Sequence, residues 1–291
     1  MKYLPSISFW VLGVVWGSNF IYMKMASEYI SSMQIVFYRV LFGFIPVLLY
    51  ALISKSIKIG HFKHSIHFFV MSLLATSVYY YGFVKGSTLL LSGVAGALSG
   101  SIPLFAFLLA ITFLKDERAT PHKILGVVIG FAGVLVIARV FEQGVGGSNF
   151  EGVAYMVAGA LSVGSSFVYA RRFISPLNIP AAALTTYQLG FALVSLLFVT
   201  NFDGANAIWA NMHTTLGMVL GLGLLGTGLA YIIYYYIVET LGAVTASSAT
   251  YIPPVVALFI GAFIVGEHIE LIDYVSTLII FAGVFLIKKA R

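Results

Sequence analysis

The chain has 291 residues, of which 60% are hydrophobic and only 9% are charged; soluble domains carry about 25% charge, so the composition predicts an integral membrane protein and excludes a soluble domain. It contains no cysteine, which excludes disulfides, cysteine metal sites and thiol chemistry. The net charge is +6, but the basic residues flank apolar runs, so we interpret them as topology signals and expect no nucleic-acid partner.

Ten apolar runs are long enough to cross about 30 Å of hydrocarbon as helices that rise 1.5 Å per residue. The loops between these runs are short, so we expect no soluble domain. The first run contains Trp16 and Asn19 and has a counterpart in mid-chain, so we expect it to be kept and not cleaved as a signal peptide. The runs cover residues 5–23, 33–53, 67–86, 92–114, 122–140, 151–170, 181–200, 214–237, 244–266 and 272–288.

The chain contains an internal repeat. The stretch that begins at Tyr81 recurs without a gap from Tyr231 onward. A second, shorter similarity relates Gly17-Ser18-Asn19-Phe20 to Gly164-Ser165-Ser166-Phe167. We therefore expect one five-helix unit written twice, as residues 1–143 and 144–291. Further matched pairs are Tyr22 with Tyr169, Lys24 with Arg171, Ile102-Pro103 with Ile252-Pro253, Glu117 with Glu267, and Phe131-Ala132-Gly133-Val134 with Phe281-Ala282-Gly283-Val284.

An odd number of helices in each unit requires the second unit to enter the membrane upside down. The charge pattern agrees, because the loop Lys115-Asp116-Glu117-Arg118 is basic whereas its counterpart, Glu267-His268-Ile269-Glu270, is acidic. Many transporters use such inverted repeats to open a site near the bilayer midplane to each side in turn.

The positive-inside rule orients the chain. If the amino terminus is cytoplasmic, only Lys24, Arg39, Lys85 and Arg139 of the 16 basic residues are left for the outer side. We therefore predict a multi-pass protein of the bacterial inner membrane with both termini in the cytoplasm. The residues assigned to the inner face are Lys2, Lys55, Lys58, Lys63, Lys115, Arg118, Lys123, Arg171, Arg172, Lys288, Lys289 and Arg291.

From residue 5 to residue 288 the chain resembles the drug/metabolite transporter superfamily, in particular its EamA-type ten-helix members. The resemblance implies an all-α membrane fold of two inverted five-helix repeats around a central cavity, and efflux or exchange of small organic solutes. Ser276 stands where the first unit has Gly126, which predicts looser helix packing there. The residues that carry the resemblance are Trp16-Gly17-Ser18-Asn19-Phe20, Lys24, Pro103, Glu117, Gly126, Gly133, Pro253, Glu267 and Gly283.

Tyrosines form the first group of candidate binding residues. Tyr231 and Tyr235 share one helical face, and Tyr81 is the repeat counterpart of Tyr231. A phenol combines an apolar ring with a hydroxyl, and its face also attracts cations. The alternative is a tyrosine belt at the lipid headgroups, which we favour for Tyr234–Tyr236 near a predicted helix end.

Polar residues within the apolar runs form the second group. They either contact substrate or hold helices together. The proline beside some of them, Pro103 or Pro253, frees a carbonyl and allows a kink, so both prolines are predicted hinges. The complete set of predicted substrate-binding residues is Trp16, Ser18, Asn19, Tyr22, Tyr81, Ser99, Ser101, Ser165, Tyr169, Tyr231, Tyr235, Thr250 and Tyr251.

Ionisable residues in a membrane helix are functional suspects. Arg39 either attracts a substrate carboxylate or, in the interpretation we favour, snorkels to the outer headgroups. All carboxylates fall at the ends of the predicted runs, so no buried proton relay is expected. His61, His64 and His67 could share one face, but a solvated turn is favoured over a metal site.

These patterns predict a secondary transporter for small amphipathic metabolites, with amino acids or related amines first and drugs second, working outward by alternating access. The alternative is an uptake carrier for a cationic solute in an aromatic cage. An intramembrane enzyme is not expected, because no nucleophile–base pair or acid pair lies at mid-depth. The expected partners are a small-molecule substrate and the lipid bilayer, with no cofactor and no metal, and a homodimer is left open.

Overall fold

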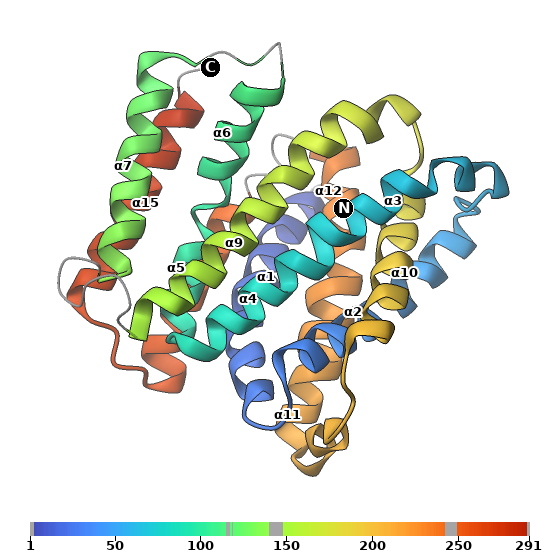
Figure 1. Ribbon diagram of the computed structural model, residues 1–291, viewed down its shortest axis with the longest axis horizontal. Coiled ribbons are helices and arrows are strands. Elements are labelled where there is room, and N and C mark those ends of the chain that lie inside the picture. Colours follow the sequence, from blue (N-terminus) through green and yellow to red (C-terminus); the bar gives the residue numbers. More distant parts are fainter. Residues whose placement is uncertain (1–2, 115–116, 118, 140–147, 242–248, 290–291) are drawn as a thin grey trace.

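A computed structural model describes the chain except residues 1–2, 115–116, 118, 140–147, 242–248 and 290–291. All regular secondary structure in the described part is helical, which confirms the all-α prediction (Figure 1). Large apolar side chains such as Trp10, Leu49 and Phe198 are exposed, as expected of helices that face lipid. Outside the described residues lie the predicted boundary between residues 143 and 144 and the charged residues Lys2, Lys115, Asp116, Arg118 and Arg291.

The first half of the chain forms one series of helices and the second half another. The first series is α1 (Leu4–Ser27), α2 (Ser32–Ile53), α3 (Ser65–Ser72), η2 (Leu73–Ser77), α4 (Val78–Leu89), α5 (Ser92–Ser99), α6 (Ile102–Phe113) and α7 (Pro121–Ile137). The second is α9 (Ser148–Tyr169), η3 (Ala170–Ile174), α10 (Ala181–Val199), α11 (Met212–Leu216), η6 (Gly217–Leu229), α12 (Ala230–Leu241), η7 (Ala249–Tyr251), α14 (Ile252–Phe259), η8 (Ile260–Val265) and α15 (Leu271–Lys289). Short 3-10 turns occupy Ile59–His64, Ser175–Leu177 and Ala205–Ala210.

Within the described residues, each of the ten apolar runs contains helix. In the described part, seven continuous segments are long and apolar enough to cross a membrane. Three more, Pro121–Ile137, Ala249–Val265 and Leu271–Ile287, are apolar but shorter than the roughly 20 residues of an average crossing helix. The presence of several membrane-crossing helices is therefore established, while a count of ten stays a prediction.

Local sequence explains where these helices begin and break. Ser31 and Gln34 form a capping box at the start of α2, and the Thr120 hydroxyl caps α7. A turn at Gly100-Ser101 separates α5 from α6, and Pro103 lies in the first turn of α6, where its missing N–H breaks no helical bond. Pro253 has the same place in α14, after the short turn η7.

Helices α7 and α15 pack side by side and run in opposite directions (Figure 1). Glycines permit this approach: a Cβ added at Gly126 would lie 2.6 Å from the Gly283 carbonyl oxygen, and one at Gly133 would lie 2.9 Å from the Ser276 carbonyl oxygen. The prediction of looser packing at Ser276 is wrong, because Ser276 is completely buried and its hydroxyl bonds to the Ile272 carbonyl at 2.6 Å.

Contacts along α4 fix the relative directions of α1 and α9. Phe20 packs on Phe83 and the Lys24 ammonium reaches the Leu90 carbonyl, so α1 and α4 run the same way. Helix α9 is antiparallel to α4. Gly82 of α4 lies beside Gly159 of α9, whereas Gly86, later in α4, lies beside the earlier residue Gly152 of α9. Figure 1 shows α4 and α9 lying alongside each other. Helices α1 and α9 therefore point in opposite directions.

Candidate functional site

Arg39 lies inside the protein and not at its surface. It sits about 10 Å along α2 from Ser32, at 1.5 Å per residue, and only 4% of its surface is exposed. The favoured prediction that this side chain snorkels to the headgroups is therefore wrong. The guanidinium instead extends between α1, α4 and η6, where neutral polar groups receive it.

Three helical segments, α1, α4 and η6, supply the groups that surround the Arg39 guanidinium. The Arg39 Nε donates to the Thr227 hydroxyl at 3.1 Å, and Nη1 lies 3.6 Å from the Met23 sulfur. The Tyr80 ring covers the guanidinium, with its centroid 3.9 Å from the central carbon. When the Asn19 amide oxygen faces Arg39, it accepts from Nη2 at 3.1 Å while the amide nitrogen donates to a backbone carbonyl of α1. We call these five residues the Arg39 cluster.

Glycine and an unusual helix geometry make the cluster possible. A Cβ at Gly226 would lie 2.2 Å from a terminal atom of the Asn19 side-chain amide, so only glycine leaves room for this amide. Segment η6 is a π-helix, and its Thr227 hydroxyl donates to the Leu222 carbonyl five residues earlier at 3.0 Å. Wide turns of this kind are frequent at functional sites, because they redirect side chains from the regular helical face.

An aromatic and polar frame adjoins the cluster. Tyr79 packs against Tyr80 with ring centroids 5.0 Å apart, and Tyr231 stacks with Tyr235 at 6.2 Å. The Tyr235 hydroxyl forms a hydrogen bond with Thr185 of α10. Nearby, the Gln188 amide donates to Thr76 at 2.8 Å. Polar side chains from both halves of the chain thus meet in the interior.

The predicted site residues divide into two sets. Asn19 belongs to the Arg39 cluster, and Tyr231 and Tyr235 border it. Trp16 instead packs near Tyr234, at 6.1 Å between ring centroids, and Tyr22 fills the space beside two glycines of η6.

Other predicted residues lie elsewhere. Tyr81 meets Tyr155 of α9 edge-on and not its counterpart Tyr231, and Tyr169 bonds to His67 at 2.7 Å. Thr250 and Tyr251 are partly buried at the start of α14. The hydroxyls of the four predicted serines donate to nearby backbone carbonyls and not to side chains. Those of Ser18, Ser99 and Ser165 donate within their own helices, and that of Ser101 donates to the Leu98 carbonyl of the preceding helix α5.

The predicted set of binding residues did not include Met23, Tyr80 or Thr227, although Tyr80 stands directly beside the predicted Tyr81 in the sequence. Thr227 is a polar residue in a glycine-rich apolar run, and that was the available signal. The helical face on which it falls depends on the π-helix, which a regular 3.6-residue period does not predict.

One end of the molecule contains a buried carboxylate. The Glu267 side chain is 6% exposed, pairs with Lys24 at 3.2 Å and accepts from the backbone N–H groups of Ser92 and Gly93 at 2.8 and 3.1 Å. Burial alone would raise the pKa of Glu267, but these hydrogen bonds and the Lys24 charge outweigh it, so the pKa lies below its usual value. We call this the Glu267 end; its carboxylate lies beyond the predicted helix, as expected, but is buried.

A pH prediction follows from that lowered pKa. The contribution of Glu267 to stability is fully present above the pKa of the unfolded carboxyl and is lost as pH falls through the lower folded value. The difference in unfolding temperature between wild-type protein and Glu267→Gln is therefore expected to be constant near neutral pH and to shrink in acid. Differential scanning fluorimetry in detergent measures it; a difference that grows on acidification would contradict the assignment.

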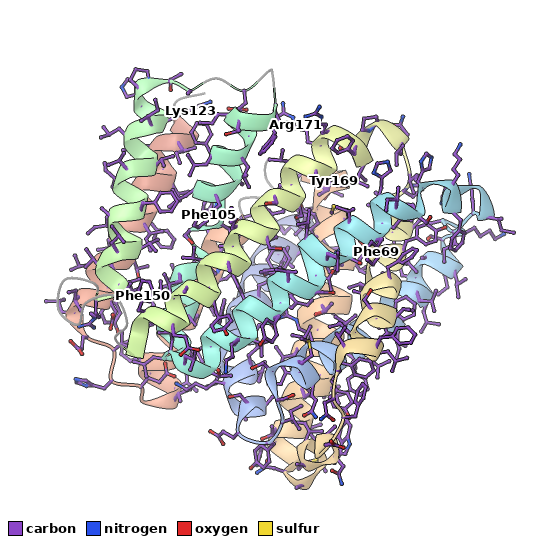
Figure 2. The ribbon with its side chains drawn as sticks, viewed as in Figure 1. Phe69, Phe105, Lys123, Phe150, Tyr169 and Arg171 are labelled. Atoms are coloured by element: carbon purple, nitrogen blue, oxygen red, sulfur yellow. The ribbon has the colours of Figure 1, made fainter. Side chains whose placement is uncertain are left out.

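The opposite end carries the repeat counterpart of this carboxylate. Glu117 pairs with Lys123 at 2.7 Å and with Arg171 at 3.7 Å, and Figure 2 shows Lys123 and Arg171 at the same end of the molecule. Glu117 corresponds to Glu267 and Arg171 to Lys24, so the two ends carry equivalent ion pairs. The Glu117 end is the looser, because Glu117 is 24% and Arg171 52% exposed.

Within the described residues, no group of three His, Cys, Asp or Glu side chains is arranged to hold a metal ion. His61 lies 3.2 Å from the Tyr187 hydroxyl and His67 bonds to Tyr169, so tyrosines engage these two histidines. At the Glu267 end, Arg139 pairs with Glu270 and Asp273 beside an open depression of about 480 Å³. A central cavity stays a prediction.

Apolar helices long enough to cross a bilayer, with a buried cationic cluster between them, define a polytopic helical membrane protein with an internal polar site. Residues 5–139 and 150–288 each match the EamA-like transporter family. The chain belongs to this family and is a membrane transporter, not an enzyme.

Curated relatives resemble between about two thirds and nearly all of the chain. An uncharacterized transporter of Archaeoglobus fulgidus is 24% identical over 95% of each chain, and the uncharacterized transporter YdfC of Bacillus subtilis is 27% identical over 93% of this chain and 86% of its own. The uncharacterized inner membrane transporter YedA of Escherichia coli is 24% identical over 69% and 63%. A crystal structure with a TM-score of 0.64 and 17% identity, covering 97% of this chain and 95% of its own, shares the fold.

Proposed function

We propose that this protein is a secondary transporter that carries small amphipathic metabolites, amino acids or related amines first and drugs second, outward across the bacterial inner membrane. Two inverted five-helix units, residues 1–143 and 144–291, would give the Arg39 cluster access to each side in turn. The observation that carries the proposal is the cluster itself: α1, α2 and α4 of the first unit and η6 of the second converge on one buried cation.

Equivalent contacts support the inverted repeat. In the repeat, Gly126 corresponds to Ser276 and Gly133 corresponds to Gly283. The close contact of Gly126 with Gly283 therefore has a repeat-related counterpart, the close contact of Ser276 with Gly133, and the structure contains both. The counterpart helices α7 and α15 are antiparallel, as a two-fold axis perpendicular to them requires. The opposite directions of α1 and α9 agree with the same axis.

A second pair of contacts supports the repeat independently. A Cβ at Gly17 of α1 would lie 2.5 Å from Val256 of α14, and a Cβ at Gly164 of α9 would lie 2.9 Å from the Ala106 nitrogen of α6. Gly17 corresponds to Gly164, and Val256 to Ala106. The same packing therefore recurs in both units, α1 on α14 and α9 on α6.

The two carboxylate ends support alternating access. Glu267 is buried under three donors, whereas Glu117 is partly exposed and its Arg171 partner lies farther away. This difference favours a state that is closed at the Glu267 end. With both termini in the cytoplasm, the Glu267 end faces outward, so the state is closed to the outside. A transporter would tighten the equivalent Glu117 contacts when the Glu267 end opens.

The proline hinges give a separate prediction. Pro103→Ala and Pro253→Ala restore an N–H near the breaks that precede α6 and α14, so these segments can become stiffer and more continuous helices. We expect several-fold slower transport, on the order of 1 kcal/mol in a barrier, with unchanged protein abundance. Pro5→Ala, in the first turn of α1, is the matched control. Unchanged flux in both hinge variants would contradict the hinge role.

Purified protein in proteoliposomes tests the function. We expect labelled phenylalanine to exchange across the vesicle membrane and labelled choline not to. Uptake of choline without phenylalanine would instead favour the alternative, a carrier for cations in an aromatic cage, for which Tyr231 and Tyr235 are the available rings. No exchange of any amino acid, amine or quaternary ammonium compound would contradict both.

A further inference from the structure

Arg39 is a buried cation that takes no part in the ion pairs at the two ends of the molecule. We infer that Arg39 binds a carboxylate group of the substrate, so that the transported class is carboxylic acids, including zwitterionic amino acids, and not free amines or quaternary ammonium ions. This inference rests on the proposed transport function and narrows its substrate.

The charges in the interior of the protein support binding of an anion at Arg39. Within the part of the chain that the structure describes, carboxylates pair with Lys24, Lys123, Arg139 and Arg171, and none lies within ion-pair distance of Arg39. Its described partners are all uncharged. A buried charge is costly unless a charge of opposite sign accompanies it. A substrate carboxylate would supply that opposite charge only while the site is occupied.

The hydrogen bonds of the guanidinium leave some of its N–H groups available for such a ligand. A guanidinium has five N–H groups, and the described acceptors are the Thr227 hydroxyl, the Asn19 amide oxygen and the weak Met23 sulfur. The terminal nitrogens therefore retain N–H groups for a further acceptor. A carboxylate takes two N–H groups of an arginine side by side, with stronger bonds than a neutral acceptor makes.

The rest of the frame suits the other parts of such a molecule. The Tyr80 ring holds one face of the guanidinium in place, which fixes the direction of its N–H groups. Tyr231 and Tyr235 offer ring faces to an apolar substituent and hydroxyl groups to an amino group. A lone cation, by contrast, would meet the like charge of Arg39 in a poorly solvated interior.

The test compares acids with their amides on the full-length protein. Phenylalanine, leucine and threonine are each paired with the corresponding amino-acid amide, and phenethylamine and choline are added. Wild-type protein in detergent is scanned for ligand-induced thermal stabilisation, and exchange is measured in proteoliposomes. We expect at least one acid to stabilise and exchange, with an apparent affinity at least tenfold above that of its amide.

Variants then locate the effect. Arg39→Gln is expected to lower the apparent affinity for the acid at least tenfold while its amide changes little, and Arg39→Lys to recover part of the loss, since lysine keeps the charge but not the fork of N–H groups. Arg172→Gln, which removes the same charge at an exposed position that bonds to the Phe113 carbonyl, is the matched control and should leave both affinities unchanged.

The outcomes separate the two ideas. If amides or amines bind and exchange as well as the acids, or if Arg39→Gln keeps the preference for the acid, the carboxylate inference is overturned while the transport function survives. If no compound exchanges in wild-type protein, the proposed function fails and the inference fails with it. The acid–amide comparison uses wild-type protein, so it decides the question even if Arg39→Gln does not fold.

Discussion

Replacing Glu267 with glutamine is expected to open the Glu267 end of the protein. The carboxylate accepts from Lys24 and from the backbone N–H groups of Ser92 and Gly93. A glutamine side chain has one oxygen for these three donors, and its NH2 group, itself a donor, must face one of them. Each charge-assisted hydrogen bond contributes about 1.5–3 kcal/mol, and each 1.4 kcal/mol changes a population about tenfold. The closed end therefore loses at least about tenfold in population.

The absence of native cysteine makes this measurable. Ser92 is 1% exposed and its hydroxyl has no hydrogen-bond partner among the described residues, so Ser92→Cys is a mild change that places one thiol beneath Glu267. Labelling by a membrane-impermeant maleimide is expected to be slow in this background and at least tenfold faster when Glu267→Gln is added. Transport should slow, because the closed state is part of the cycle.

Glu270→Gln is the matched control for this experiment. Glu270 pairs with Arg139 at the same end, but its side chain is 56% exposed, and exposed pairs contribute about 0–1 kcal/mol. Labelling of the Ser92→Cys thiol should change little in this background. Equal labelling rates with and without Glu267→Gln would show that the carboxylate does not hold the end closed.

Helical class and helix positions followed from the sequence because hydrophobic runs and short polar joints are local properties. The repeat could also be predicted, and with it the correspondence of Lys24 with Arg171 and of Glu117 with Glu267. That the corresponding residues form ion pairs at both ends was not predictable, because the pairing joins helices far apart in the chain.

The candidate site was predictable only in part. Asn19, Tyr231 and Tyr235 stand out as polar or amphipathic residues in apolar helices, and each lies in or beside the cluster. The depth of Arg39 was misjudged because distance from a helix end does not tell whether the side chain faces lipid or protein. It faces inward because η6 places Thr227 beside it, and the π-helix of η6 shifts that face.

The largest effect on folding is expected at the pair of helices that the sequence marks with matched glycines. A Cβ at Gly283 of α15 would lie 2.4 Å from the Gly126 carbonyl oxygen and 2.5 Å from the Gly130 nitrogen of α7. Both atoms belong to the backbone, so no side chain can rotate away. Gly283→Ala must therefore push α7 and α15 apart along their contact, and Gly283→Leu more so.

Overpacking of this kind costs about 1–3 kcal/mol or more, and about 1 kcal/mol lowers the unfolding temperature by 2–4 °C in a chain of this size range. We expect Gly283→Ala to lower it by about 2–12 °C and Gly283→Leu to leave little folded protein in fluorescence-detected size-exclusion chromatography.

Gly190→Ala is the matched control, since it adds the same methyl group inside the apolar helix α10, where the nearest atom is a Phe44 ring carbon at 3.5 Å. Alanine should be tolerated there and should gain slightly from its higher helix propensity.

Gly133→Ala, at the repeat-related position of Gly283, would place its Cβ 2.8 Å from the Ile280 side chain and 2.9 Å from the Ser276 carbonyl oxygen. Gly133→Ala is expected to destabilise the protein as Gly283→Ala does, because in an inverted repeat the same close contact between α7 and α15 occurs at two repeat-related positions. Tolerance of alanine at both positions would contradict that packing and weaken the case for a two-fold axis between α7 and α15.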